Sequence, residues 1–469
     1  MIALTLGDVA AAVGGRLAAG ADPATAVTGV STDSRAVAPG DLFVAVVGEH
    51  HDAHDFAAAA AAAGAAAVLA RREVDAPCVV VDDDAVLALG RLARHVVDGL
   101  PDLTVVGITG SSGKTSTKDL MAQVLVELGP VVAPQGSFNT EVGLPVTALG
   151  VDAGTRVLVS EMGARDVGHI AYLCAITPPR VGVVLNVGSA HLEIFGSREN
   201  IALTKGELVE AVPPAEQGGV AVLNADDPLV AAMASRTRGR VVLYGRSADA
   251  EVRAEDETLD AEGRGRFTLV APQGRAEVAL QVHGAHQVSN ALAVAAAALA
   301  LEIPVADVAE RLSAATAASR WRMEVSTTPS GVTLVNDAYN ANPESMTAAL
   351  DALAAMGHAR EGRPARRTWA VLGEMRELGA GSEAAHEGVG EAAAARGIDH
   401  VVAVGEGAFG VARGAQASGG ATVVQAVPDV DAAVELLRAS TAPGDVVLVK
   451  ASRGSALERV AQGLMEVTA

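Results

Sequence analysis

Short apolar runs alternate with longer amphipathic stretches along most of the chain. Apolar runs bounded by Gly, Pro or Asn predict buried strands, and the amphipathic stretches between them predict helices. In the middle of the chain this pattern predicts strands at 105–109, 156–160, 181–186, 220–224 and 241–244. The alternation is typical of a mostly parallel sheet with helices on both faces, so we expect an α/β fold.

Residues 1–100 form the first predicted unit, a small α/β domain, and Pro101-Asp102 marks the boundary that follows it. Thr5 is placed to cap a short helix. The apolar face of that helix would be Leu6, Val9, Ala10 and Val13. The pattern then predicts a helix over 56–69, a strand over 78–81 and a helix over 84–98.

Two further units follow, at 101–317 and 318–469. In the middle unit the polar segment 246–282 predicts a small antiparallel insert. The last unit shows four strand–helix steps, with strands at 332–336, 368–372, 400–404 and 445–449. These steps predict a Rossmann-like sheet, but the unit lacks a G-x-G-x-x-G fingerprint, so the fold alone implies no dinucleotide.

Composition narrows the classes of function. The 469 residues carry a formal net charge of −21 and no large Lys/Arg cluster, which argues against nucleic-acid binding. The two cysteines, Cys78 and Cys174, are too few for a disulfide framework or a metal cluster, and we expect them in cores. We find no secretory signal and no run of about 20 strongly apolar residues, and therefore expect a cytoplasmic protein without a membrane span.

The clearest chemical motif follows the strand at 105–109 and reads Gly110-Ser111-Ser112-Gly113-Lys114-Thr115-Ser116. A Gly/Ser turn at a helix N-terminus offers backbone N–H groups to phosphates. Lys114 would neutralise the outer phosphates, and the Thr115 hydroxyl would bind Mg²⁺. The general phosphate loop has Gly at the position of Ile108, so this stretch matches only the shorter form T-G-x-x-G-K-T. The alternative interpretation of the stretch is an ordinary surface turn.

Polar residues follow the other predicted strands, at the edge where ligands of such sheets gather. Glu161 is placed to bind Mg²⁺ directly or through water, with a solvated acid as the alternative. By their local pattern alone, His191 is an ordinary histidine and Lys205 a solvated helical lysine. Asn290, at the start of a helix predicted over 290–301, fits an N-cap better than a contact with a base.

In the first unit Ser31, Ser34 and Arg35 bring two hydroxyls and one guanidinium close together. Such a group suits a diphosphate, although a solvated turn explains the same residues.

The order of these motifs resembles the Mur ligase family over nearly the whole chain. Within that family the chain is most similar to members that add D-alanyl-D-alanine to UDP-N-acetylmuramoyl-tripeptide. The stretch at 373–379, Gly-Glu-Met-Arg-Glu-Leu-Gly, and the later His386 carry this closer resemblance. Members that add a free amino acid to the dipeptide precursor carry Asp-Asn-Pro-Arg in the last domain. This chain lacks that sequence, and those members are the closest alternative.

The resemblance implies roles for residues at matching positions. Glu161 and His191 match Mg²⁺-binding residues, and Lys205 matches a carbamylated lysine that holds a second Mg²⁺. Together with Lys114 these three form the expected catalytic set, and Thr115 completes the metal ligands. The implied ATP-binding positions are Gly110 to Ser116, Asn290, Arg322, Asp337, Tyr339 and Asn340. The implied substrate-binding positions are Ser31, Ser34 and Arg35 for the UDP-sugar, and Asn139 and Thr140 for the muramoyl peptide. Lys450 and Arg453 lie at the end of a predicted strand that faces the cleft, so by position we expect them to bind the dipeptide carboxylate, with a solvated turn as the alternative.

The reaction implied by the resemblance is ATP-dependent amide formation through an acyl phosphate, with ATP and Mg²⁺ as cofactors. The first unit would bind the UDP-sugar, the second ATP, and the third the dipeptide and part of ATP. We also expect a monomer. Two other classes of function remain open: a P-loop NTPase switch that hydrolyses ATP without an acceptor, and an inactive sugar-nucleotide binder.

Overall fold

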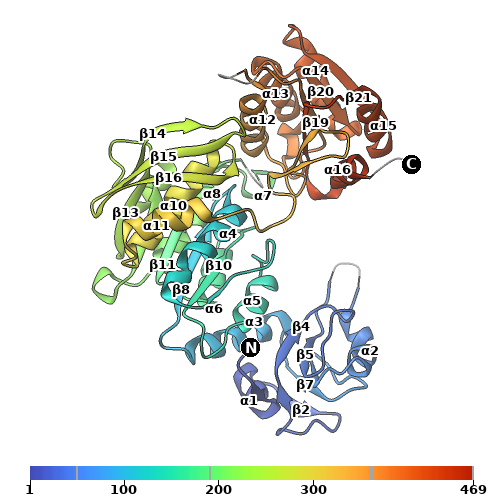
Figure 1. Cartoon of the computed structure of the whole chain (residues 1–469). Coiled ribbons are helices and arrows are strands. Elements are labelled where there is room, and N and C mark those ends of the chain that lie inside the picture. Colours follow the sequence, from blue (N-terminus) through green and yellow to red (C-terminus); the bar gives the residue numbers. More distant parts are fainter. Residues whose placement is uncertain (49–50, 190–191, 360–363, 467–469) are drawn as a thin grey trace.

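The computed structural model describes residues 1–48, 51–189, 192–359 and 364–466. Three larger sheets follow one another along the chain, and Figure 1 shows them in order from the blue end of the molecule to the red end. The fold is the mixed α/β fold that the sequence predicts. Within the described residues, no helix is both long enough and apolar enough to cross a membrane.

The first sheet has five strands, and only its edge strand β2 runs antiparallel to its neighbour. The order is β2 (Arg16–Ala18), β7 (Cys78–Val80), β6 (Ala67–Ala70), β5 (Asp41–Val44), β4 (Gly29–Ser31), and a separate pair joins β1 (Leu4–Thr5) to β3 (Ala26–Val27). Helix α1 (Leu6–Val13) is capped by Thr5, whose side chain accepts a hydrogen bond from Asp8 N. It buries the predicted apolar face.

The helix predicted over 56–69 is wrong in its second half. A 3₁₀ turn, η1 (Ala53–Phe56), leads into α2 (Ala57–Ala62), and the chain then forms β6. Gly64 has a φ of 103°, which a residue with a side chain rarely adopts, so the helix ends there. All of β6 is buried between β5 and β7, which explains its unbroken apolar run.

The central sheet has nine strands and is mostly parallel, as predicted. Its order is β16 (Gly274–His283), β15 (Arg264–Ala271), β14 (Val252–Leu259), β13 (Arg240–Gly245), β12 (Val220–Asn224), β11 (Val181–Val184), β8 (Thr104–Thr109), β10 (Val157–Glu161), β9 (Val131–Val132). The segment 246–282 is no separate insert, because β14 pairs with β13 and continues the sheet. Only β14, β15 and β16 pair antiparallel.

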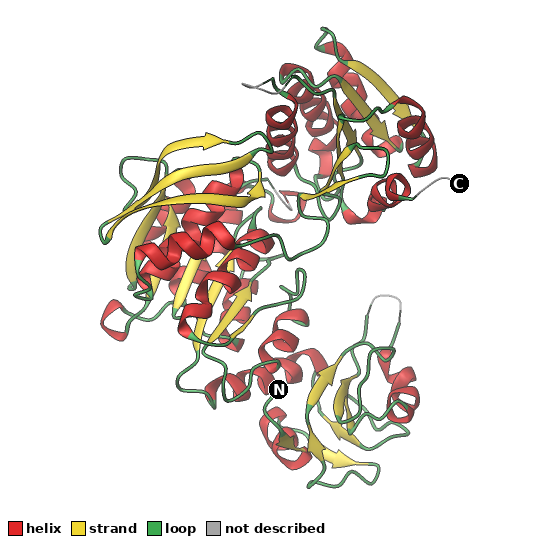
Figure 2. Cartoon of the chain, viewed as in Figure 1, coloured by secondary structure: helices red, strands yellow, loops and turns green. Residues whose placement is uncertain are grey.

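Helices cover both faces of this sheet (Figure 2). On one face lie α4 (Lys114–Val124), α10 (His286–Ala300) and α11 (Val305–Ala314). On the other lie α3 (Ala85–Asp98), α5 (Gly143–Leu149), α6 (His169–Ile176) and α8 (Arg198–Glu210). Because α3 also packs on the first sheet, these two units share one apolar core. The shorter elements are α7 (Leu192–Phe195), α9 (Pro228–Ala231), η2 (Leu125–Leu128), η3 (Ala215–Gln217) and η4 (Ala232–Arg236).

The third sheet has six strands in the order β17 (Glu324–Thr327), β18 (Thr333–Asn336), β22 (Val446–Lys450), β19 (Thr368–Leu372), β20 (His400–Val404), β21 (Val423–Val427). Five of them are parallel, one more than predicted, because the pattern missed the edge strand β21. One face carries α12 (Pro343–Gly357), α13 (Ser382–Ala395) and α14 (Phe409–Ala417), and the other α15 (Val430–Ser440) and α16 (Glu458–Met465). Short turns are η5 (Gly379–Gly381), η6 (Glu406–Ala408) and η7 (Arg453–Ser455).

A cavity of about 540 Å³ lies where the carboxyl ends of the central and third sheets meet. It is lined by the loop after β8, the end of β10, the residues after β11 and β18, and the end of β22. Parallel α/β sheets bind ligands at the carboxyl ends of their strands, so this cavity is the candidate binding site.

Candidate active site

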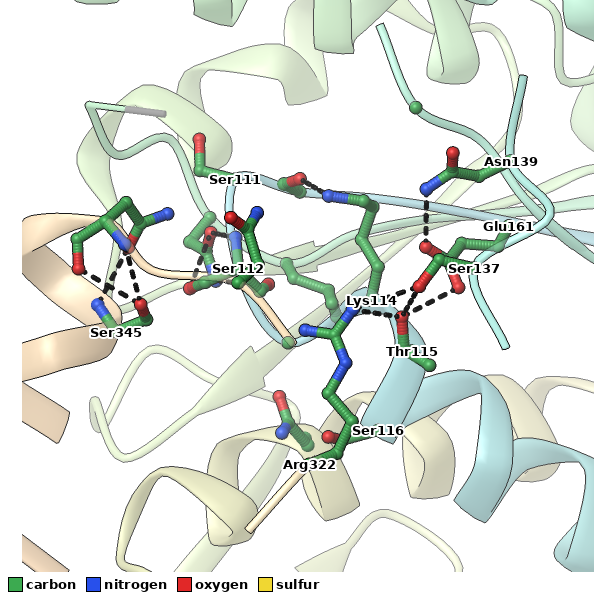
Figure 3. A pocket seen from close by; sticks show the side chains of 18 of the residues that line it. Ser111, Ser112, Lys114, Thr115, Ser116, Ser137, Asn139, Glu161, Arg322 and Ser345 are labelled. Carbon is green, nitrogen blue, oxygen red and sulfur yellow. Dashed lines mark hydrogen bonds between the residues drawn. The ribbon is translucent and has the colours of Figure 1, made fainter. Parts of the chain in front are cut away.

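The loop between β8 and α4 forms one wall of the cavity (Figure 3). Its outer part is fixed by Asn186, whose backbone oxygen accepts from Ser111 N (3.1 Å) and whose Oδ1 accepts from Ser112 N (2.9 Å). The first N–H groups of α4 have no partner within the helix, as at any helix start. Their partial positive charge makes this wall a site for phosphate oxygens.

Gly113 closes the loop and caps α4 with a φ of 81°. A Cβ atom there would lie 2.7 Å from Asn290 Oδ1, so the loop packs directly on the α10 side chain. Helix α10 begins at His286, which puts Asn290 in its second turn and makes the N-cap interpretation wrong. Asn290 Nδ2 donates to Gln287 Oε1 (2.9 Å), and this bond fixes the amide beside the loop.

Polar side chains from three segments meet at Glu161, the last residue of β10. The carboxylate is buried and accepts from Thr115 Oγ1 (3.1 Å) and from Asn139 Nδ2 (2.7 Å). Ser137 Oγ lies 2.9 Å from Thr115 Oγ1. Figure 3 shows this cluster beside Lys114.

Two lysines lie in the cavity, and the structure lowers the pKa of both. Lys114 Nζ donates to Gly110 O (2.7 Å); burial lowers its pKa, and the Glu161 carboxylate opposes that shift. Lys205, on α8, is buried, and its ammonium has no hydrogen-bond partner among the described residues. Burial, and to a smaller extent the charge of Lys114, lower the pKa of Lys205 to about 7.

The residues around Glu161 suit a hard divalent cation. Mg²⁺ typically takes one or two carboxylates and completes its shell with water and phosphate oxygens. The Thr115 hydroxyl and the Glu161 carboxylate, 3.1 Å apart in the cavity wall, fit that donor set. In the described ranges, no three or more His, Cys, Asp or Glu side chains form a metal cluster. The predicted ligand His191 lies outside those ranges.

Arg322 enters the cavity from the segment that links the central and third units. Its Nη2 donates to Ser137 Oγ (3.0 Å) and Thr115 Oγ1 (3.3 Å), and its guanidinium carbon lies 4.0 Å from the ring centre of Tyr339. The flanking residues Trp321 and Met323 have φ of 59° and 50°, in the left-handed region that side chains disfavour. This strained backbone holds Arg322 between the two units.

The positive charge of Lys450 is balanced by an ion pair with Asp337. Its Nζ donates to Asp337 Oδ2 (2.7 Å) and to Asn340 O (2.9 Å), while Asp337 Oδ1 accepts from Met323 N (3.0 Å). All three predicted residues line the cavity. The other residue expected to bind the dipeptide carboxylate, Arg453, lines a second cavity next to it.

The remaining predicted residues divide between the cavity and the first unit. Thr140 and Ser116 line the cavity together with the residues described above. The cavity is not lined by the three residues predicted to bind the UDP-sugar, Ser31, Ser34 and Arg35, which lie in the first unit. There, Ser31 Oγ donates a hydrogen bond to Asp33 O (2.9 Å). Arg35 holds the Asp33 carboxylate with two hydrogen bonds (2.9 and 2.7 Å), which lowers the pKa of Asp33 to about 2.

Sequence reasoning missed two residues that shape the site. Asn186 ends the stretch predicted as a strand next to the phosphate loop, so the rule that ligands gather at strand ends would have selected it. Ser137 lies in an irregular loop, where no pattern predicted its contact with Thr115.

Comparison with known proteins gives the same family as the order of the sequence motifs. Sequence models match the "Mur ligase family, catalytic domain" at 26–96, the "Mur ligase middle domain" at 108–298 and the "Mur ligase, glutamate ligase domain" at 321–453. The UDP-N-acetylmuramoyl-tripeptide–D-alanyl-D-alanine ligase of Mycobacterium tuberculosis is 50% identical, over 99% of this chain and 98% of that protein.

Two solved structures have the same fold over nearly their full lengths. MurF from Acinetobacter baumannii aligns with a TM-score of 0.88 and 31% identity, covering 99% of both chains. MurF ligase from Thermotoga maritima in complex with ADP aligns with a TM-score of 0.80 and 32% identity, covering 94% of this chain and 97% of that one. The chain therefore belongs to the Mur ligase family.

Proposed function

We propose that this chain is an ATP-dependent ligase that joins D-alanyl-D-alanine to UDP-N-acetylmuramoyl-tripeptide and releases ADP and phosphate. The observation that carries the proposal is the shared cavity, in which a phosphate loop, a buried carboxylate and a lysine with a lowered pKa meet residues of the third unit. The relative with this activity in its name is 50% identical across 99% of the chain.

ATP is assigned to the wall built by the phosphate loop. The N-terminus of α4 and Lys114 would take the phosphates, since both offer positive charge beside backbone donors. Asn290, Arg322, Asp337, Tyr339 and Asn340, which all line this cavity, would contact the base, the ribose and the phosphates. The ADP complex of the Thermotoga maritima relative supports a nucleotide in this family fold.

Mg²⁺ would be held by Thr115 and Glu161, with His191 and a carbamate on Lys205 as further ligands. Bound there, the ion would neutralise phosphate charge and help to orient the reacting groups. A neutral Lys205 amine is what carbamylation needs, and its lowered pKa supplies that form near pH 7.

In the proposed reaction an oxygen of the tripeptide carboxylate forms a bond to the γ-phosphorus, and the bond to ADP breaks. The amine of the dipeptide then forms a C–N bond to the acyl carbon, and the C–O bond to phosphate breaks. The phosphate leaves with the electron pair and takes a proton from the nitrogen as HPO₄²⁻. Lys114 and Arg322 would stabilise the negative charge that develops on the transferred group.

An acyl phosphate must be kept away from water. Glu344, at the start of α12, accepts from Ser189 N (2.8 Å) and from Ser189 Oγ (3.0 Å), and these contacts connect the third unit to the central one. We assign this pair to holding the cavity closed during the reaction.

The three units take three roles in this proposal. Residues 1–100 bind the UDP-sugar through Ser31, Ser34 and Arg35, residues 101–317 bind ATP, and residues 318–469 bind the dipeptide and part of ATP. Asn139 and Thr140 would hold the muramoyl peptide. Cytoplasmic location and a monomeric state stay predictions.

The test is a panel of donor and acceptor pairs with ATP and Mg²⁺, read by the mass of the product. We expect a pentapeptide product from the tripeptide donor and D-alanyl-D-alanine. A product only from the dipeptide donor and a free diamino acid would move the chain to the other type of Mur ligase. ATP hydrolysis that neither partner affects would indicate an NTPase switch instead.

A further inference from the structure

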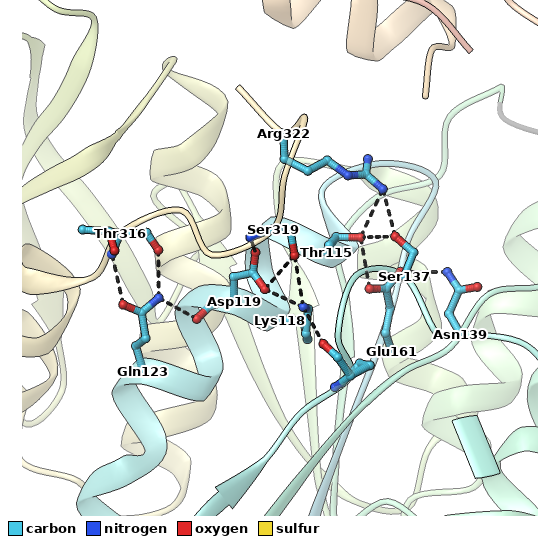
Figure 4. A network of polar contacts seen from close by, with 11 residues as sticks. Thr115, Lys118, Asp119, Gln123, Ser137, Asn139, Glu161, Thr316, Ser319 and Arg322 are labelled. Carbon is cyan, nitrogen blue, oxygen red and sulfur yellow. Dashed lines mark hydrogen bonds and ion pairs between the residues drawn. The ribbon is translucent and has the colours of Figure 1, made fainter. Parts of the chain in front are cut away.

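Two charged side chains lie buried on α4 one turn after the phosphate loop, and the proposed reaction uses neither. The side chains of Lys118 and Asp119 are 3% and 7% exposed and form an ion pair of 2.5 Å. Because residues three and four positions apart share one side of a helix, the pair lies on the same side of α4 as Thr115 (Figure 4). A buried ion pair adds little net stability, since the loss of water from two charges offsets their attraction. Stability therefore does not account for the pair.

The pair is fully hydrogen-bonded, and its bonds reach two other segments. The Lys118 ammonium has three donors, and they meet three acceptors: Asp119 Oδ1, Pro134 O (2.8 Å) and Ser319 Oγ (3.3 Å). Asp119 in turn accepts from Ser319 N (2.9 Å) and Ser319 Oγ (3.1 Å). No donor of the ammonium is left for a ligand. The pair is therefore an anchor that joins α4 to the loop at 133–137 and to the linker at 316–323, which connects the central and third units.

Each anchored segment brings one side chain to Thr115. Ser137 lies three residues after Pro134, and its Oγ is 2.9 Å from Thr115 Oγ1. Arg322 lies three residues after Ser319, and its Nη2 donates to Thr115 Oγ1 (3.3 Å) and to Ser137 Oγ (3.0 Å). Three residues of extended chain span at most about 10 Å. A fixed Ser319 therefore limits where the Arg322 side chain can reach.

The linker changes its partner at Arg322. Before this residue, both backbone groups of Thr316 bond to one side chain of α4 (2.8 and 3.1 Å). After it, Met323 N donates to Asp337 Oδ1 (3.0 Å), which belongs to the third unit. Among the described residues, the bonds at Ser319 are the hydrogen bonds to the central unit that lie nearest before Arg322. Release of Ser319 would therefore free the chain next to Arg322 from α4.

We propose that Asp119 is a positioning residue for the reaction, because it holds the linker on α4 so that Arg322 reaches Thr115. Lys118 completes the anchor. This inference rests on the proposed function, in which Arg322 stabilises charge on the transferred phosphoryl group. Removal of the Asp119 carboxylate takes away the acceptor of both Ser319 donors and leaves Lys118 without its counter-charge. The linker then moves more freely, and Arg322 spends less time at Thr115.

A double-mutant cycle tests this role, because it measures whether Asp119 acts through Arg322. Wild type, Asp119→Asn, Arg322→Ala and the double variant are compared by kcat/KM for ATP in dipeptide-dependent phosphate release, with saturating donor and acceptor. We expect Asp119→Asn to lower kcat/KM about 10- to 100-fold when Arg322 is present, as misplacement of a reacting group by about 1 Å does. In the Arg322→Ala background the same change should cost less than about twofold, since no guanidinium is left to position.

Ser319→Ala gives a milder version of the same test. It removes one hydroxyl and keeps the ion pair of Lys118 with Asp119, so it tests the anchor even if Asp119→Asn unfolds. It should lower kcat/KM about 3- to 10-fold, the value of one hydrogen bond, and again only when Arg322 is present. The melting temperature of each variant identifies any loss of the fold.

Glu127→Gln is the matched control. It breaks an ion pair with Arg311 that joins η2 to α11 within the central unit and lines no part of the cavity, so kcat/KM should stay at the wild-type value. The role of Asp119 is overturned if the folded Asp119→Asn or Ser319→Ala variant keeps wild-type activity. It is also overturned if either change costs the same factor with and without Arg322, as a purely structural contact would. Phosphate release from wild type that does not depend on the dipeptide overturns the proposed function itself, before any variant is compared.

Discussion

Lys205 should bind CO₂ reversibly, because the fold keeps a large fraction of its amine neutral near pH 7. Its pKa of about 7 compares with 10.5 for an unperturbed lysine. At pH 7 about half of the amine is then neutral, against about 0.03% at the ordinary pKa, which is a gain on the order of 10³. Since carbamates form from neutral amines, we expect Lys205 to carry one at modest CO₂ pressure.

The pH dependence follows from the lowered pKa. Lys205 gains a proton as the pH falls through about 7, so at constant CO₂ pressure the carbamate should be lost below that pH and formed above it. Two measurements follow this change between about pH 6 and about pH 8. One is the carbamate carbon resonance with ¹³C-labelled CO₂, and the other is the rate of dipeptide-dependent phosphate release with and without CO₂.

Lys205→Ala should remove the resonance and nearly abolish ligation, and short carboxylates such as formate or acetate should restore part of the rate. Lys450 is an internal control, because its ammonium is paired with Asp337 and should give no carbamate. A wild-type rate of ligation by Lys205→Ala, or the absence of a carbamate from the folded wild-type protein at about pH 8, would refute a carbamylated Lys205.

Three further predictions concern the phosphate loop and the contact between units. Lys114→Ala should lower ATP turnover at least about 100-fold through loss of phosphate neutralisation, and a wild-type rate of phosphate release would contradict the loop assignment. Gly113→Ala should weaken nucleotide binding, because its φ of 81° disfavours a side chain and the new Cβ would meet Asn290 Oδ1 at 2.7 Å; calorimetric titration with ADP measures this, and unchanged affinity would count against it. Glu344→Ala should release more phosphate per amide formed, because the contacts with Ser189 are lost; an unchanged ratio of phosphate to product would show that this contact does not protect the intermediate.

Much of the fold could be predicted from local pattern. Helix α1 has its cap and its buried face where the sequence puts them, because Thr5 and a regular apolar spacing are both local signals. The Ala-rich stretch failed because alanine favours a helix and also fits a buried strand, so only Gly64 marks the change. The edge strand β21 is partly exposed and lacks the apolar run that revealed the other strands.

The site shows the same division between local and distant signals. The placement of the β8–α4 loop and of Glu161 in the cavity wall could be predicted, because each lies next to a recognisable strand. The lowered pKa of Lys205 could not, because it depends on burial by the whole fold and on the nearby charge of Lys114. The contact of Arg322 with Thr115 joins residues far apart in the sequence and needs the third unit in place.

In the proposed reaction the γ-phosphoryl group of ATP is transferred to the tripeptide carboxylate in this cavity, and the amide forms afterwards. The most direct measurement uses a tripeptide donor with ¹⁸O in its terminal carboxylate, together with ATP, Mg²⁺ and D-alanyl-D-alanine, and reads the isotope in the released phosphate. An acyl phosphate requires one donor oxygen in every phosphate released with the pentapeptide. Released phosphate without the label would contradict the account, because ATP would then be hydrolysed without passing through the carboxylate.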